Sequence, residues 1–317
     1  MYFRRFALIT LLLVSMFLMG CNRVGAAHGQ AIPDLPSATA LPTETETQTP
    51  LPTLTSTATL TPTATLTLTS TPTPTPTWAM QGPGKVVCPI LLYHHISISS
   101  SQVASTYYVA PEDFEMQMKA LSDWGYTSIS ITQLTEAILH GAPLPNHPVV
   151  ITFDDGNLDV YTNAFPIMQK YGFSGVVYIV VNFIYADGYM GVDQIQEMVA
   201  AGWEVGSHSM THAHLSDAHE RLNFEIYQSR IELQGALGLT VRSFAYPYGE
   251  MDATVTQVQS YGYTSAVGLG TLWNQSVNNL YYLSRRPVIG WVDLGTFASY
   301  LPWSGPVELV PTFTPTP

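Results

Sequence analysis

The fold of the chain is indicated most clearly by the stretch Pro148-Val149-Val150-Ile151-Thr152-Phe153-Asp154-Asp155-Gly156. Its first six residues are mostly apolar or β-branched, which is typical of a strand buried on both faces of a parallel sheet. Two carboxylates follow directly, and adjacent buried charges are costly unless a partner neutralises them. A divalent metal ion is one such partner. The alternative is a loop in which one Asp caps the next helix and the other is solvated.

Short apolar runs alternate with amphipathic segments on both sides of this stretch. The predicted strands are residues 86–93, 148–153, 175–181, 203–208, 243–246, 264–269 and 282–291, and the predicted helices are 111–124, a short one from 132, 163–171, 193–201, 217–237, 252–261 and 294–301. This alternation indicates an α/β fold with a parallel sheet covered by helices. About seven such units favour a closed, distorted β/α barrel, whose chemistry lies at the carboxyl ends of the strands.

The first 21 residues have the features of an export signal. Arg4 and Arg5 precede an apolar run from Phe6 to Met19, which is short for a transmembrane helix. Leu18-Met19-Gly20-Cys21 then resembles a lipobox, so we predict a lipoprotein signal peptide at 1–21 and lipidation of Cys21. An ordinary signal peptide or an uncleaved anchor are the alternatives. As a lipoprotein, the protein would be secreted across the cytoplasmic membrane and held on its outer face by the lipid anchor.

The next segment is too rich in Thr and Pro to bury a core. We therefore predict a disordered stalk at 22–84, a folded domain at 85–310 and a disordered Thr/Pro tail at 311–317. The net charge of -12 argues against a nucleic-acid partner. We expect a monomer that meets the membrane only through its lipid anchor.

A second polar cluster, His208-Ser209-Met210-Thr211-His212, follows the predicted strand at 203–208. Histidines four residues apart lie on one face of a helical turn and can share one metal ion. Together with Asp155 they make a set of two imidazoles and one carboxylate, which leaves positions open for water and substrate. Such a set suits Zn2+, and equally Fe2+ or another divalent ion.

Three motifs in this order resemble the NodB-type polysaccharide deacetylases, carbohydrate esterase family 4. They are Thr152-Phe153-Asp154-Asp155-Gly156, His208-Ser209-Met210-Thr211-His212 and Tyr246-Pro247-Tyr248-Gly249. The resemblance covers nearly all of the predicted domain and implies the NodB-homology barrel. It also implies a hydrolase that acts on carbon–nitrogen bonds of non-peptide amides in carbohydrates.

The resemblance implies a role for each matching residue. Asp154 would be the general base that takes a proton from metal-bound water. Asp155, His208 and His212 would bind the metal, with Zn2+ usual in the family and Co2+, Ni2+ or Fe2+ as alternatives. Tyr248 would offer its backbone N–H to the oxyanion.

Two departures from the family pattern point to one of its branches. Ala245 stands where many members have an arginine that pairs with the base, and no C-terminal Leu-x-x-His supplies the general acid. Both gaps resemble the circularly permuted poly-N-acetylglucosamine deacetylases, which place the acid early. By position His94 matches that acid, with His95 as the less favoured choice. We predict that Arg286 replaces the missing arginine.

The resemblance therefore implies removal of N-acetyl groups from an N-acetylglucosamine-containing polysaccharide outside the cell or in its wall, with release of acetate. Two alternatives remain: an O-acetyl polysaccharide esterase, and a catalytically weakened glycan-binding module of the same fold, for which Ala245 is the main hint. Tyr246, Trp273 and Trp291 are candidates for stacking on sugar rings.

Overall fold

The computed structural model describes residues 78–79, 81–98, 105–250 and 255–305. The predicted signal peptide with Cys21, the stalk up to residue 77 and the tail at 311–317 lie outside the described residues. The described residues begin before the predicted boundary at Lys85, and there β1 (Trp78–Ala79) pairs with β7 (Leu144–Pro145). None of the helices in the described ranges is both long enough and apolar enough to cross a membrane.

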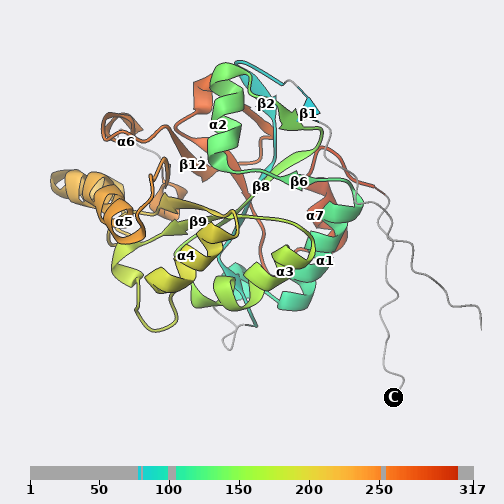
Figure 1. The fold of residues 1–317 in the computed structure, drawn as a ribbon, viewed down its shortest axis with the longest axis horizontal. Coiled ribbons are helices and arrows are strands. Elements are labelled where there is room, and N and C mark those ends of the chain that lie inside the picture. Colours follow the sequence, from blue (N-terminus) through green and yellow to red (C-terminus); the bar gives the residue numbers. More distant parts are fainter. Residues whose placement is uncertain (1–77, 80, 99–104, 251–254, 306–317) are drawn as a thin grey trace, which may run out of the picture. The chain divides into compact units, whose positions relative to one another are not determined.

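Seven parallel strands close into a barrel, which confirms the predicted fold class (Figure 1). In their order around the barrel they are β3 (Ile90–Tyr93), β14 (Leu283–Pro287), β12 (Ser265–Leu269), β11 (Ser243–Ala245), β10 (Glu204–Ser207), β9 (Val176–Ile179) and β8 (Pro148–Phe153). The ring closes where β3 pairs with β8, with Leu92 opposite Thr152. The short strand β6 (Thr127–Ser128) pairs with Pro148 and Val149 at the beginning of β8.

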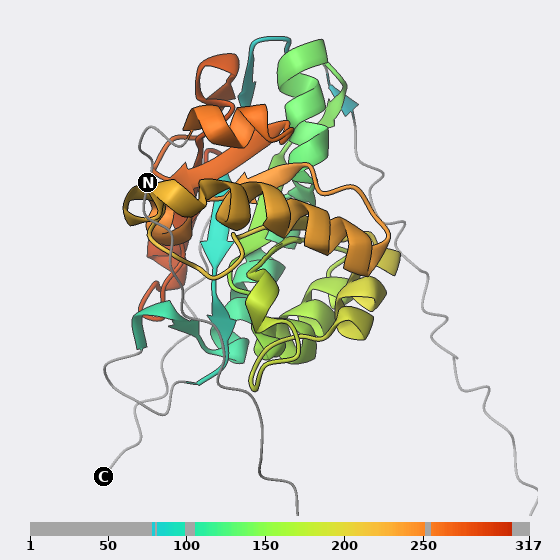
Figure 2. The ribbon, with the colours of Figure 1, turned by 90° about the vertical axis from the view of Figure 1, so that its left-hand side faces the viewer.

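The helices lie outside this ring, with α1, α3 and α4 grouped on one side in Figure 1 and α5 crossing the front in Figure 2. Their bounds are α1 (Pro111–Asp123), α2 (Ile131–His140), α3 (Phe165–Lys170), α4 (Val192–Ala200), α5 (Ser229–Leu237), α6 (Val255–Ser260) and α7 (Leu294–Ser299). The predicted helix at 217–237 is interrupted. It contains the 3-10 turn η5 (His219–Arg221) and the π-helical turn η6 (Asn223–Gln228) before α5 begins.

Two further strand pairs lie beside the barrel. β2 (Lys85–Val87) pairs antiparallel with β13 (Asn274–Ser276), and β4 (His95–Ile96) pairs parallel with β5 (Tyr108–Val109). β4 follows β3 after a single residue, His94. The β4–β5 pair therefore stands directly beyond the carboxyl end of a barrel strand.

Alternation along the strands divides the core into two clusters. Leu91, Ile151 and Val177 belong to the larger cluster, which lies between the barrel and its helices. Ile90, Val150, Val176, Ala245, Val267 and Leu283 belong to the smaller one, which fills the barrel interior. Because successive strand residues point to opposite faces, this pattern states which residues of each strand face inward.

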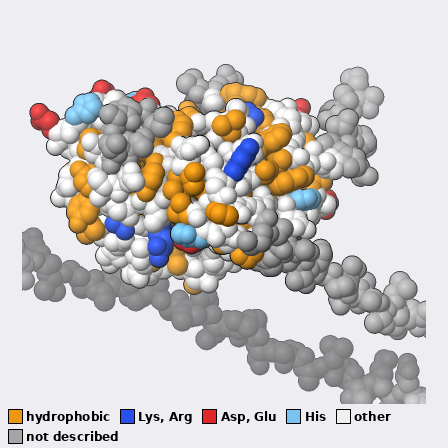
Figure 3. Space-filling model, turned by 90° about the horizontal axis from the view of Figure 1, so that it is seen from above, with side chains coloured by type: hydrophobic (Ala, Val, Ile, Leu, Met, Phe, Trp, Pro, Cys, Tyr) orange, Lys and Arg blue, Asp and Glu red, His pale blue; other side chains and the backbone are white. Residues whose placement is uncertain are grey.

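Helix α2 closes the amino-terminal end of the barrel. Its residues Ile131, Leu134 and Ile138 pack in the interior cluster with the first residues of the strands. A capping box between Ser130 and Gln133 begins the helix. The view from above Figure 1 shows scattered groups of hydrophobic side chains and few charged ones (Figure 3), in keeping with a charged fraction of 11%. Because α2 fills the amino-terminal end of the barrel, the carboxyl ends of the strands are left for the site.

Candidate active site

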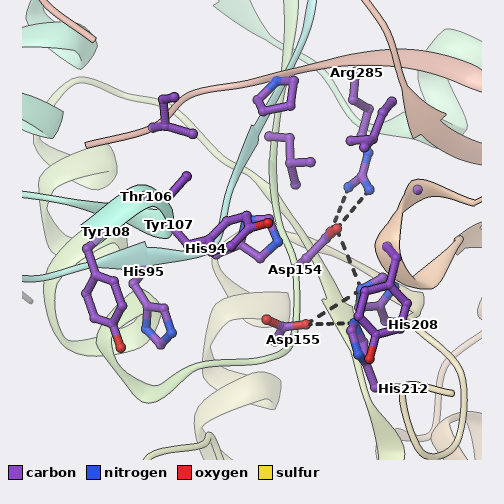
Figure 4. A pocket seen from close by; sticks show the side chains of 16 residues that line it. His94, His95, Thr106, Tyr107, Tyr108, Asp154, Asp155, His208, His212 and Arg285 are labelled. Carbon is purple, nitrogen blue, oxygen red and sulfur yellow. Dashed lines mark hydrogen bonds and ion pairs between the residues drawn. The ribbon is translucent and has the colours of Figure 1, made fainter. Parts of the chain in front are cut away.

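One pocket of about 450 Å³ lies at the carboxyl ends of the barrel strands (Figure 4). It brings together the predicted residues from β3, β8, β10 and β11, although they are up to 154 positions apart in the sequence, from His94 to Tyr248. Its lining consists of Leu92, His94, His95, Thr106, Tyr107, Tyr108, Asp154, Asp155, His208, His212, Tyr248, Gly249, Leu269, Arg285, Pro287 and Ile289.

Asp155, His208 and His212 converge on one point. Their ligand atoms all lie within 4.8 Å of one another, as a shared metal ion would require. Oδ1 of Asp155 is 3.6 Å from Nε2 of His208 and 3.5 Å from Nε2 of His212. These three residues form a set of two imidazoles and one carboxylate that could hold a divalent ion.

Oδ1 of Asp155 supports this fit independently, because it is buried and has no hydrogen-bond partner among the described residues. A buried carboxylate oxygen without a partner is costly, so it is expected to have one when the protein functions. Asp155 also has a left-handed backbone, with φ of 74°, which non-glycine residues seldom adopt. Strain of this kind is found where a site must aim a side chain.

His208 is oriented for metal binding by its second ring nitrogen. Nδ1 lies 2.8 Å from the backbone oxygen of Ala245. Since a carbonyl oxygen only accepts, Nδ1 carries the hydrogen and Nε2 is left with a free lone pair that faces Asp155. The backbone of the residue that replaces the family arginine thus still contributes to the site.

The segment from His208 to His212 is a loop, so the predicted helical turn is wrong. Ser209 and His212 both have left-handed φ angles, of 72° and 60°, which no helical turn contains. These two reversals bring the imidazoles together instead. Glu225, fully buried, fixes the loop by accepting from the backbone N–H of Thr211 at 3.0 Å and from its hydroxyl at 2.7 Å.

Asp154 lies beside Asp155, His208 and His212, which we call the metal triangle. It forms a buried ion pair with Arg285 through two hydrogen bonds. Nη1 and Nη2 of Arg285 donate to the two carboxylate oxygens at 2.6 and 2.8 Å, and Nε donates to the oxygen of Gly268 at 3.1 Å. Both side chains are almost completely buried. An arginine therefore does accompany the candidate base, although Ala245 does not supply it.

The predicted arginine, Arg286, is the wrong one. Its guanidinium lies 4.6 Å from the ring centre of Tyr300. Strand alternation explains the difference, because Arg285 shares the inward face of β14 with Leu283, whereas Arg286 points outward. In the sequence, the signal that could have identified Arg285 was the apolar Leu283 two residues before it. Residues two apart in a strand face the same side, and Leu283 packs inside the barrel.

The ion pair sets the charge of Asp154. Burial would raise its pKa, but the charge of Arg285 and the hydrogen bonds that it donates outweigh burial and lower the pKa to about 2. Asp154 is therefore ionised at neutral pH and can accept a proton or a hydrogen bond. His208 Nε2 lies 3.7 Å from Oδ2 of Asp154, so the candidate base adjoins the metal triangle.

The two neighbouring histidines have different surroundings. His94 lies between Tyr107, at 4.8 Å between ring centres, and the carboxylates of the site. Burial lowers its pKa, while Asp154 and Asp155 act in the opposite direction. His95 instead contacts Asp159, with Nδ1 2.8 Å from Oδ2. Of the two, His94 is the one whose charge is coupled to Asp154.

Tyr248 borders the same pocket in the turn after β11. Its backbone is left-handed, with φ of 60°. Its ring stacks on His214 at 3.7 Å and packs against His212 at 4.5 Å. His214 is in turn 3.0 Å from Glu250. These contacts hold the turn that carries the Tyr248 N–H next to the metal triangle.

The aromatic residues suggested for sugar stacking do not line the pocket. Tyr246 is completely buried and its hydroxyl donates to the oxygen of Tyr281 at 2.9 Å, so this suggestion is wrong. Trp273 and Trp291 are partly exposed but lie outside the pocket lining.

Comparisons with known proteins agree on the kind of domain. Residues 141–266 match the family model described as polysaccharide deacetylase. YxkH from Bacillus subtilis (strain 168), provisionally named a polysaccharide deacetylase, is 26% identical over 67% of this chain and 75% of its own length. The poly-beta-1,6-N-acetyl-D-glucosamine N-deacetylase of Staphylococcus aureus (strain MRSA252) is 25% identical over 59% of this chain and 70% of its own length.

A solved structure has a similar fold. The crystal structure of BC0361, a polysaccharide deacetylase from Bacillus cereus, superposes with a TM-score of 0.62. It is 28% identical to this chain, and the match covers 68% of this chain and 69% of that one. The match to this structure covers more of the chain than residues 141–266, the segment that the family model matches.

Proposed function

Because the chain carries a NodB-type polysaccharide deacetylase domain, we propose that it is a metal-dependent hydrolase that removes N-acetyl groups from an N-acetylglucosamine-containing polysaccharide. The observation that carries the proposal is the convergence of Asp155, His208 and His212 beside the Asp154–Arg285 ion pair in one pocket. The Staphylococcus aureus relative, named for an amide-linked acetyl substrate, supports the choice of polymer.

Asp155, His208 and His212 would hold the ion, with zinc as the proposed metal. A divalent ion there lowers the pKa of water and polarises a carbonyl. Asp154 accepts the proton of the attacking water, since it is ionised and next to the triangle. Arg285 keeps the carboxylate oriented through its two hydrogen bonds.

The remaining residues act on the acetyl group as the C–N bond breaks. The backbone N–H of Tyr248 donates to the oxyanion that develops on the carbonyl oxygen. His94 donates a proton to the departing nitrogen, which an amide requires because a free amide anion is a poor leaving group. Water and the N-acetyl sugar are consumed, and acetate and the amino sugar are released.

The Asp154–Arg285 pair favours an enzyme over a weakened glycan-binding module. Ala245 was the main hint toward lost catalysis, because the family arginine is missing there. Arg285 makes the corresponding contact from β14, so the hint no longer applies.

A substrate panel tests the proposal. Acetate release should be measured side by side on chitooligomers, poly-N-acetylglucosamine, peptidoglycan and acetylxylan, with the Asp154→Asn variant as control. We expect release from an N-acetylglucosamine polymer, and an Asp154→Asn protein that binds metal but releases no acetate. Release from acetylxylan alone would make the protein an ester hydrolase. Full activity of Asp154→Asn would remove the base assignment.

We also propose that the domain acts outside the cytoplasmic membrane, tethered through Cys21. The support is the basic, apolar and lipobox-like order of residues 1–21 and the Thr/Pro-rich segment that follows. Incorporation of labelled fatty acid that is lost in Cys21→Ala would agree with this. Labelling that persists in Cys21→Ala would contradict it.

A further inference from the structure

A second histidine of the pocket is held by contacts that the proposed mechanism does not use. His95 lies in β4, and the β4–β5 register places it opposite Tyr108. The two rings stack at 4.1 Å and are parallel to within 5°. Figure 4 shows His95 and Tyr108 side by side. This stacking fixes the plane of the imidazole.

Asp159 fixes the hydrogen on that imidazole. Its Oδ2 lies 2.8 Å from Nδ1 of His95 and also accepts from the hydroxyl of Ser97 at 2.8 Å. A carboxylate only accepts hydrogen bonds, so Nδ1 carries the hydrogen. In the neutral ring, Nε2 is then an acceptor with a fixed direction.

Nε2 of His95 has no partner among the described residues, whereas Nδ1 has one. The side chain is 25% exposed and lines the pocket. In Figure 4, His95 and Tyr108 lie on one side of the pocket and Asp155, His208 and His212 on the other. The pocket thus has a wall of metal ligands and a facing wall with one prepared acceptor.

The positions of the metal ligands and of His95 on facing walls of the pocket indicate where the sugar lies. The acetyl group has to reach Asp154 and the metal triangle, so the sugar ring that bears it extends across the pocket. Its hydroxyl groups are hydrogen-bond donors, and a neutral imidazole nitrogen accepts from them. We infer that His95 binds a hydroxyl group of the acetylated sugar and is a specificity-determining residue, an inference that rests on the proposed deacetylase function.

The role differs from that of His94. His94 adjoins Asp154 and acts on the departing nitrogen, whereas His95 is held by Asp159 and contacts the sugar at a distance from the reacting bond. Loss of His95 should therefore matter only for substrates that carry the hydroxyl. Loss of a proton donor would matter for every amide.

The test compares wild type and His95→Asn on an N-acetylglucosamine oligomer and on its singly deoxygenated analogues. Asn keeps a donor near the Nδ1 position for Asp159 but lacks the Nε2 acceptor. On the parent oligomer, kcat/KM should fall about tenfold, as expected for one hydrogen bond. For one analogue, wild type should lose the same factor and His95→Asn should lose nothing further.

Controls separate binding from damage to the fold. His95→Gln, whose amide reaches the Nε2 position, should recover most of the loss. Ser97→Ala, which removes the other donor to Asp159, should stay within about twofold of wild type. Unfolding temperature and metal content should match wild type in all three variants.

Three results would overturn the inference: unchanged kcat/KM in His95→Asn on the parent oligomer, an equal loss on every analogue, or no recovery in His95→Gln. If wild type releases acetate but any of these is found, only the role of His95 fails. If wild type releases no acetate from the parent oligomer, the proposed function fails and the inference fails with it.

Discussion

Replacing Arg285 by Met tests the ion pair on which the account of Asp154 depends. The change removes both donors to a carboxylate whose side chain is 3% exposed. Breaking a buried pair from one side costs about 3–5 kcal/mol, because the remaining charge is left in a low dielectric. The pKa of Asp154 gives a second measure. Its fall from 3.8 to about 2 corresponds to about 2 kcal/mol of stabilisation at neutral pH.

The sign of the pH dependence follows from the same shift. Since the folded pKa of Asp154 lies below its ordinary value of 3.8, the stabilisation is fully present above that pH and is lost as the pH falls toward 2. In Arg285→Met, burial acts without the arginine, so the pKa of Asp154 should rise. The difference in stability between wild type and variant should therefore shrink as the pH falls.

The assay is urea unfolding of wild type, Arg285→Met and Arg286→Met at neutral and acidic pH. Arg286→Met is the matched control, because that side chain lies over the ring of Tyr300, a contact of about 0.5–1 kcal/mol, and among the described residues Asp154 pairs with Arg285 instead. We expect Arg285→Met to lose at least about 2 kcal/mol at neutral pH and to release acetate poorly. A loss of stability in Arg285→Met no larger than that in Arg286→Met would show that the Asp154–Arg285 pair does not stabilise the fold.

Three further predictions concern the pocket. His94→Ala should slow hydrolysis of an N-acetyl sugar far more than that of 4-nitrophenyl acetate, whose leaving group needs no proton; equal losses on both substrates in steady-state assays would contradict the acid role. Glu225→Ala should weaken zinc affinity about 10–100-fold by releasing the Thr211 loop, whereas the exposed Glu220→Ala should not, and equal affinities in a competition titration with a chelator would exclude this support. Asp155→Asn should reduce bound metal in mass spectrometry of the intact protein, and an unchanged metal content would remove Asp155 from the ligand set.

Much of the barrel could be predicted because its strands are continuous apolar runs separated by helical periodicity. The carboxyl ends of parallel strands meet at one edge, so the motifs at 154–155 and 208–212 were expected to converge. Choosing between Arg285 and Arg286 required only the parity of β14, which the neighbouring Leu283 indicates.

Other parts of the site could not be predicted from local pattern. The loop from His208 to His212 depends on left-handed angles at Ser209 and His212, which non-glycine residues adopt uncommonly. The contact of His95 with Asp159 joins residues 64 positions apart in the sequence, and the β4–β5 pair that positions His95 has two residues in each strand. Such contacts follow from tertiary packing, and the hydrophobic periodicity of the sequence does not predict them.

We propose that a metal held by Asp155, His208 and His212 is required for removal of acetyl groups. The most direct measurement is acetate release from an N-acetylglucosamine oligomer by the full chain before chelation, after chelation and after addition of zinc. We expect release that chelation abolishes and zinc restores. Undiminished release from protein shown to be free of metal would contradict it.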